Sequence, residues 1–91
     1  MQSGNILSGT VYYSDLTPVA GAWVSLYDPT EKTTYYAITD SNGHYAITAP
    51  ADNDYVFDVW FETTRHGPIS PIDLSTGDIT GYDVTLSIPP P

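Results

Sequence analysis

Cysteine is absent from this 91-residue chain, and basic residues are almost absent. Lys32 and Arg65 stand against eleven Asp and Glu residues, so the formal net charge at pH 7 is -9. Because binding to phosphate backbones depends on clustered Lys and Arg, this composition argues against nucleic acid as a partner. An anionic membrane surface is disfavoured for the same reason. Without cysteine, redox chemistry does not fix the compartment of the protein.

Long apolar runs and helical periodicity are also missing. No stretch approaches the length that spans a bilayer, so we expect no membrane insertion. No stretch repeats apolar residues at the helical spacing over three turns, so helices are not expected. The start of the chain lacks the charged segment and apolar run of a signal peptide, so we expect an exported protein to appear here in mature or excised form.

Aromatic residues and turn formers are abundant. Eight Tyr, two Trp and two Phe are interrupted at short intervals by seven Gly and eight Pro. Alternating apolar and polar residues between these turns predict seven strands, the sixth weakened by Pro71. The sequence therefore predicts an all-β fold, a seven-stranded antiparallel β-sandwich over residues 1–88, with 89–91 as a Pro-rich tail or linker. The predicted strands cover residues 6–13, 22–27, 33–39, 44–49, 55–61, 69–74 and 81–88.

The order of short motifs resembles a known family. Ser8-Gly9-Thr10-Val11 precedes a P-x-x-G-A-x-V segment at residues 18–24 and a T-D-x-x-G-x-Y segment at residues 39–45. This pattern is similar to that of the carboxypeptidase regulatory-like domain and covers nearly the whole chain. The resemblance implies a transthyretin-like Greek-key sandwich. Such domains occur as appendages to enzymes, in outer-membrane receptors and in bacterial surface proteins, so the fold itself is not the active part.

A related group, the collagen-adhesin B-type domains, crosslinks a Lys of the first strand to an Asn of the last. Here the lone Lys32 lies in a predicted turn, and no Asn follows Asn53. We therefore expect no isopeptide bond.

The sequence contains no convincing catalytic set. Nucleophilic catalysis needs a base beside the nucleophile. His44 follows the Asn42-Gly43 turn and His66 lies in a predicted loop, and their separation does not fit a metal hydrolase. We therefore expect no catalytic residue and a protein that is not an enzyme.

Acidic residues are predicted to gather at one end of the sandwich. In alternating strands the second, fourth and sixth loops meet at the same end, and five carboxylates there repel one another unless a cation lies among them. No EF-hand pattern is present, and Asp is a common turn former, so separate solvated turn residues are the alternative. Calcium is thus a hypothesis, and no other cofactor is expected. The candidate ligands are Asp28, Glu31, Asp52, Asp54 and Asp78.

Large aromatic residues are predicted on outward faces. Trp23, Tyr27 and Trp60 alternate with the core residues of their strands, and we expect Tyr35 to join them. Exposed aromatic patches mark interaction surfaces. These side chains suit stacking on sugar rings or packing against another copy of the protein, and cover by loops is the remaining alternative.

The arrangement of the termini favours assembly. Seven alternating strands place the termini at opposite ends, which suits head-to-tail stacking. The segment containing Asn5, Ile6, Leu7 and Val11 has the character of a strand that adds to a neighbour's open sheet edge. We interpret the chain as an extracellular or cell-surface structural module, the subunit of a filament or part of a tandem-domain protein, with itself as partner. The alternative is a glycan-binding accessory module of a secreted enzyme or adhesin.

Overall fold

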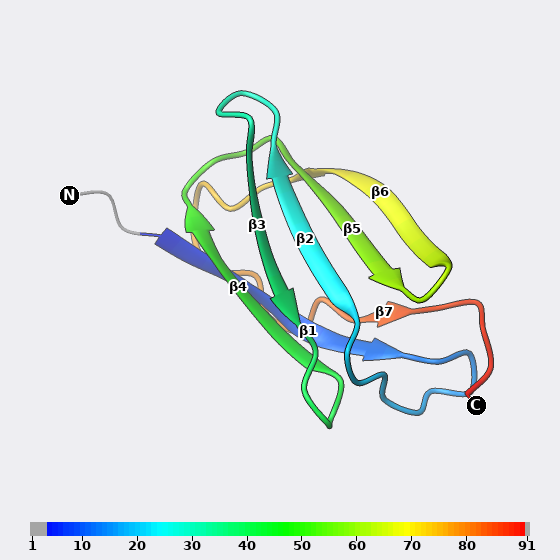
Figure 1. Cartoon of the computed structure of the whole chain (residues 1–91). Coiled ribbons are helices and arrows are strands. Elements are labelled where there is room, and N and C mark those ends of the chain that lie inside the picture. Colours follow the sequence, from blue (N-terminus) through cyan, green and yellow to red (C-terminus); the bar gives the residue numbers. More distant parts are fainter. Residues whose placement is uncertain (1–3, 91) are drawn as a thin grey trace.

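The protein consists of seven strands in two facing sheets (Figure 1). Its structure is a computed structural model that describes residues 4–90. These residues contain no helix, and hence none that could cross a membrane. The predicted all-β sandwich is therefore confirmed. The strands are β1 (Gly4–Tyr12), β2 (Trp23–Asp28), β3 (Thr33–Ile38), β4 (His44–Pro50), β5 (Tyr55–Phe61), β6 (Thr64–Ile72) and β7 (Val84–Thr85).

The two sheets have the strand orders β3-β2-β5-β6 and β4-β1-β7. The four-stranded sheet is antiparallel throughout, but β7 runs parallel to β1, with Val11 opposite Val84. In a sandwich of alternating strands the first and the seventh point the same way. Placing them side by side therefore makes this single pairing parallel, which the prediction of a purely antiparallel sandwich did not include.

Alternation along the strands builds the core, as predicted. In β4 the side chains of Tyr45, Ile47 and Ala49 are buried and those between them are exposed. In β5 the buried set is Tyr55, Phe57 and Val59. Burial of these aliphatic and aromatic side chains between the sheets is the dominant stabilising term. The remaining buried hydrophobic residues are Leu7, Val11, Tyr13, Val19, Ala22, Val24, Leu26, Ile72, Leu74, Val84 and Leu86.

The sixth strand begins earlier than predicted. A long loop was expected over residues 62–68, but β6 begins at Thr64 after a tight turn in which Glu62 has a φ of 54°. Pro68 and Pro71 lie within this strand. They are tolerated because β6 is at the edge of its sheet and its pairing with β5 has two register shifts, so fewer backbone donors are needed there.

The last strand is shorter than predicted. Only Val84 and Thr85 have strand geometry, although Val84 and Leu86 are buried as their alternation indicated. The chain remains attached beyond them, because the carbonyl of Ile88 accepts a hydrogen bond from the Ser14 amide at 2.8 Å. The boundary proposed at residue 88 stays a prediction.

Gly9 permits a close crossing of two segments. A Cβ at this position would lie 2.0 Å from the carbonyl oxygen of Tyr82. The neighbouring Ser8 bonds to the same segment, since its amide donates to Ile79 and its carbonyl accepts from Tyr82, both at 2.9 Å. The glycine of the Ser8-Gly9-Thr10 motif thus lets the segment before β7 lie directly on β1.

The N-terminal segment that was expected to add to a neighbour's sheet edge is paired within its own chain. Asn5, Ile6 and Leu7 pair with β4, and Ile6 accepts a hydrogen bond from Ile79 on its other side. Val11 pairs with β7. β1 is the central strand of its sheet, because a segment with strong strand character finds partners within its own chain. The two ends of the described chain do lie at opposite ends of the elongated sandwich, as expected (Figure 1).

Candidate functional site

The outward side of the four-stranded sheet carries large apolar side chains. Trp23 of β2 lies opposite Ile38 of β3 and Trp60 of β5. Its indole stacks on the ring of Tyr36, with centroids 5.1 Å apart and an interplanar angle of 23°. All four side chains are about half exposed, and Tyr27 is exposed further along β2. We call Trp23, Tyr36, Ile38 and Trp60 the aromatic patch.

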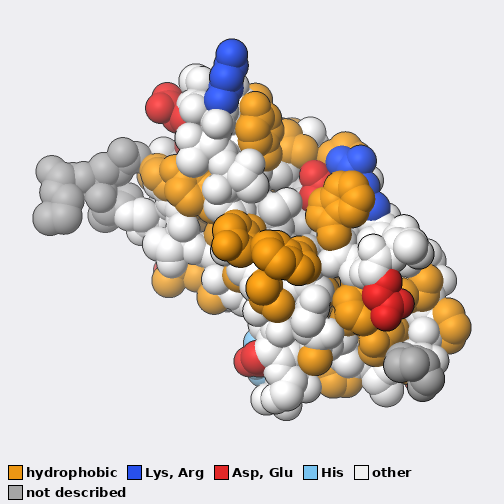
Figure 2. Space-filling view, in the orientation of Figure 1, with side chains coloured by type: hydrophobic (Ala, Val, Ile, Leu, Met, Phe, Trp, Pro, Cys, Tyr) orange, Lys and Arg blue, Asp and Glu red, His pale blue; other side chains and the backbone are white. Residues whose placement is uncertain are grey.

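Figure 2 looks onto this sheet and shows hydrophobic side chains gathered over β2 and β3. Over β5 and β6 it shows another hydrophobic side chain with basic and acidic groups beside it. Exposed apolar groups that are contiguous, rather than scattered, mark an interaction surface. The predicted outward positions of Trp23, Tyr27 and Trp60 agree with the structure.

The predicted outward position of Tyr35 is wrong. Tyr35 lies opposite Leu26 and points inward, where its ring meets that of Tyr55 edge-on at 6.2 Å. Its neighbour Tyr36 is the exposed residue of the pair. The run Thr33–Ile38 has two adjacent tyrosines and no charged residue, so its own pattern did not determine which tyrosine faces the core.

Polar groups border the patch beside β5. The guanidinium of Arg65 lies 4.8 Å from the ring centroid of Trp60, a cation–π arrangement. The Arg65 Nε donates to Asp58 Oδ1 at 3.0 Å, and Asp58 lies opposite Ser25 of β2. These contacts hold the Arg65 side chain of β6 over β5 and place hydrogen-bonding groups next to the aromatic patch.

β3 forms an unprotected edge of the four-stranded sheet. Its backbone pairs only with β2, so the other row of amide and carbonyl groups has no strand partner within the described chain. Edge strands are usually protected from pairing with another chain by a proline, a charged residue or a bulge, and β3 contains none of these. The opposite edge, β6, has Pro68, Pro71 and an irregular register. Of the two edges of the four-stranded sheet, β3 is therefore the open one.

The acidic end forms largely as predicted. The end of β2 and the loop after β4 bring carboxylate oxygens of Asp28, Asp52 and Asp54 within 4.8 Å of one another. Glu31 lines the adjoining hollow of about 250 Å³ without joining the three. Asp78 is not among the three, and its Oδ1 accepts a hydrogen bond from the amide of Ile6 at 2.8 Å. We call Asp28, Asp52 and Asp54 the acidic triad.

Hydrogen bonds and mutual repulsion act on the acidic triad in different directions. Burial works to raise the pKa of the Asp28 carboxyl, but the amides of Glu31 and Thr30 and a hydrogen bond with Asp52 outweigh it and lower that pKa. The amide of Asn53 works to lower the pKa of Asp52, but the hydrogen bond shared with Asp28, burial and the neighbouring charges raise it. Three acids this close cannot all ionise freely.

Asp54 is the least satisfied member of the triad. Its Oδ2 accepts a hydrogen bond from Thr30 Oγ at 2.5 Å. Its Oδ1 is buried and has no hydrogen-bond partner among residues 4–90. Buried polar atoms are nearly always paired, so this oxygen needs an explanation.

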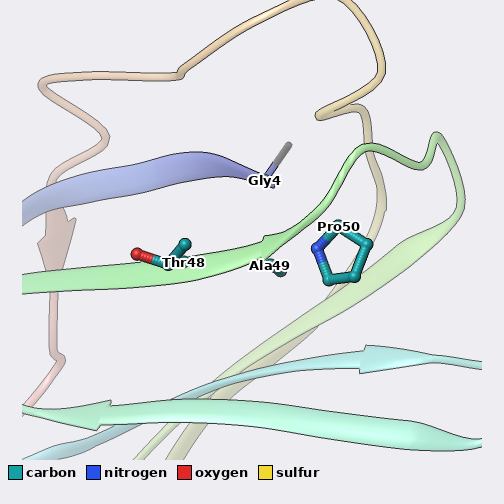
Figure 3. A pocket seen from close by; sticks show the side chains of 4 residues that line it. All are labelled: Gly4, Thr48, Ala49 and Pro50. Carbon is teal, nitrogen blue, oxygen red and sulfur yellow. The ribbon is translucent and has the colours of Figure 1, made fainter. Parts of the chain in front are cut away.

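A further hollow of about 290 Å³ lies where β1 begins beside β4 (Figure 3). Of the four residues that line it, Gly4, Thr48, Ala49 and Pro50, only Thr48 has a polar side chain. A single hydroxyl among small apolar groups offers neither a nucleophile–base pair nor a charged contact, so we assign no site there.

The two histidines lie on different sheets. His44 is exposed at the start of β4, and its backbone amide donates to Asp40 Oδ1 at 3.0 Å. His66 lies on β6 opposite Val59. Among residues 4–90 no hydrogen bond joins either imidazole to a nucleophile or a carboxylate, so neither belongs to a recognisable catalytic set.

Comparison with known proteins supports the fold. The carboxypeptidase regulatory-like domain family matches residues 6–87. No curated protein matches the chain. The solved structure of catechol 1,2-dioxygenase from Acinetobacter sp. ADP1, inhibited by bound mercury, is similar with a TM-score of 0.64 and 15% sequence identity. The similarity covers 94% of this chain but 53% of the dioxygenase chain, and at this identity it shows the fold alone.

Proposed function

The chain belongs to the carboxypeptidase regulatory-like domain family, and we propose that it is a non-enzymatic association module that joins copies of itself outside the cell or at its surface. One observation carries the proposal: the aromatic patch lies directly beside the unprotected edge of β3. Tyr36 and Ile38 are on the edge strand itself, and Trp23 is on the strand next to it. An incoming strand therefore meets unpaired backbone groups and an apolar surface together.

Pairing of β3 with β3 of a second copy satisfies both features. Antiparallel pairing joins the two four-stranded sheets into one and brings the two aromatic patches side by side, which is the self-complementary geometry of a two-fold interface. Aromatic side chains are enriched at the centres of such interfaces. This arrangement replaces strand addition by the N-terminal segment. A filament or tandem array needs a second contact, and the opposite positions of the two ends of residues 4–90 support linkage along the long axis.

Light scattering over a range of concentrations tests the association. We expect the wild-type mass to rise with concentration towards twice that of the monomer. In Ile38→Lys a charge on the edge strand should leave a monomer with an unchanged melting temperature, because Ile38 is half exposed in the single chain. Ala46→Lys, on an exposed position of β4 in the other sheet, is the matched control and should associate like the wild type.

Two outcomes contradict the proposal. One is a wild-type protein that stays monomeric at millimolar concentration. The other is equal loss of association in Ile38→Lys and Ala46→Lys, which would indicate a general effect of charge and not an interface at β3.

Glycan binding is a second candidate, favoured by the polar groups of Arg65 and Asp58 beside Trp60. Sugar sites combine an exposed aromatic ring with nearby hydrogen-bonding groups. We rank this function below association because both indoles already have an intramolecular contact, Trp23 with Tyr36 and Trp60 with Arg65. Binding to a glycan array that Trp60→Ala abolishes, in a protein that remains monomeric, would reverse this order.

A further inference from the structure

We propose that the acidic triad of Asp28, Asp52 and Asp54 binds a divalent cation of the calcium type. The site lies between the end of β2 and the β4–β5 loop, at one end of the sandwich. It is separate from the aromatic patch on the outer sheet face, so the proposal does not depend on the association function.

The spacing of the carboxylates fits a single ion. Their oxygens lie within 4.8 Å of one another. Calcium–oxygen distances are about 2.3–2.6 Å, so two ligands on opposite sides of one calcium ion are separated by roughly 4.8 Å, and ligands on adjacent sides by less. One ion can therefore touch all three residues. The triad offers only oxygen, which selects a hard cation over zinc or copper.

The unpaired oxygen of Asp54 is an independent sign of a missing ligand. Asp54 Oδ1 is buried and accepts no hydrogen bond from residues 4–90. The adjacent Asp28 is only 2% exposed, whereas Asp52 and Asp54 are half-buried. A buried carboxylate oxygen without a donor is destabilising, and a bound cation supplies the missing partner.

No basic side chain of the described chain neutralises the triad. Among residues 4–90 the one ion pair joins Arg65 to Asp58, on the outer sheet face. The whole chain has a formal charge of -9, so the surrounding field adds to the repulsion. A divalent ion relieves this repulsion where the three carboxylates meet. The hollow beside the triad, which Glu31 also lines, leaves room for the ion's remaining oxygen ligands, including water.

Calorimetry and melting temperatures of the chelator-treated full chain at pH 7 test the site. We expect calcium chloride to give a saturable heat with one ion per chain and to raise the melting temperature. Asp52→Asn should weaken calcium binding at least tenfold. Its melting temperature without calcium should not fall, because the substitution removes a like charge and keeps the oxygen that accepts the Asn53 amide. Glu62→Gln, the same charge change in the β5–β6 turn, should retain the full response.

Terbium provides a second measurement that does not depend on stability. Tyr35 lines the hollow, so a bound Tb³⁺ ion should show luminescence when tyrosine is excited, and calcium should displace it. The absence of heat, melting shift and luminescence at millimolar calcium or terbium overturns the proposal. So does an equal loss in Asp52→Asn and Glu62→Gln, since that indicates diffuse screening of charge and not a site.

Discussion

The buried hydroxyl of Thr39 predicts a large and chemically specific loss of stability. Thr39 Oγ donates to the carbonyl of Val19 at 2.6 Å and accepts from the amide of Ala22 at 2.9 Å. Val19 and Ala22 are fully buried, and Thr39 is only 4% exposed, so water cannot replace these bonds. Thr39→Val keeps the shape of the side chain but leaves one buried donor and one buried acceptor unpaired.

The magnitude follows from the cost of these unpaired groups. Each costs about 1–3 kcal/mol, so we expect the free energy of unfolding to fall by roughly 2–6 kcal/mol. A domain of this size loses about 4–8 °C in melting temperature per kcal/mol, so the decrease should exceed about 8 °C. Thr39→Ser keeps both bonds and loses one methyl group, which costs only about 1 kcal/mol. Calorimetry and urea unfolding measure both variants, and a Thr39→Val protein as stable as Thr39→Ser would refute the reasoning.

Two further predictions concern the packing of β1 and the buried tyrosines. Gly9→Ala should prevent folding or lower the melting temperature far more than the neighbouring Ser8→Ala, because a Cβ would lie 2.0 Å from the backbone of Tyr82; equal melting curves contradict this. Burial and nearby carboxylates raise the pKa of Tyr55 to about 12, above the value of about 10 in an unfolded chain. The unfolded state therefore releases this proton first, and stability should fall as the pH rises from about 10 to 12. Denaturant unfolding at several alkaline pH values should show a shallower fall in Tyr55→Phe, and an unchanged slope contradicts the assignment.

The sequence was most informative where a single strand determines the outcome. The alternation of apolar and polar residues in the sequence corresponds to the alternating burial along β4 and β5, and the Asn42-Gly43 turn lies between β3 and β4 as predicted. The acidic triad was also within reach of the sequence, because loops that alternate between two ends need no knowledge of side-chain packing.

Features that depend on neighbouring strands were harder to predict. The inward position of Tyr35 follows from its register against Leu26, which the run of tyrosines does not contain. The central position of β1 in its sheet depends on the segment from Ile79 to Tyr82. This segment forms hydrogen bonds with β1 although the two are far apart in the sequence. The early start of β6 depends on pairing with β5, because Arg65 and His66 carry little strand character by themselves.

Net charge links the two proposed properties. An exposed aromatic patch beside an open edge normally risks uncontrolled aggregation. A charge of -9 on each copy opposes close approach, so association at β3 must overcome a repulsion that falls as salt is added, with a screening length of about 10 Å at 0.1 M. Cation binding at the acidic triad lowers the charge without touching the sheet face. The effect of calcium on association must therefore be compared with that of sodium chloride at equal ionic strength, because only calcium acts through Asp52.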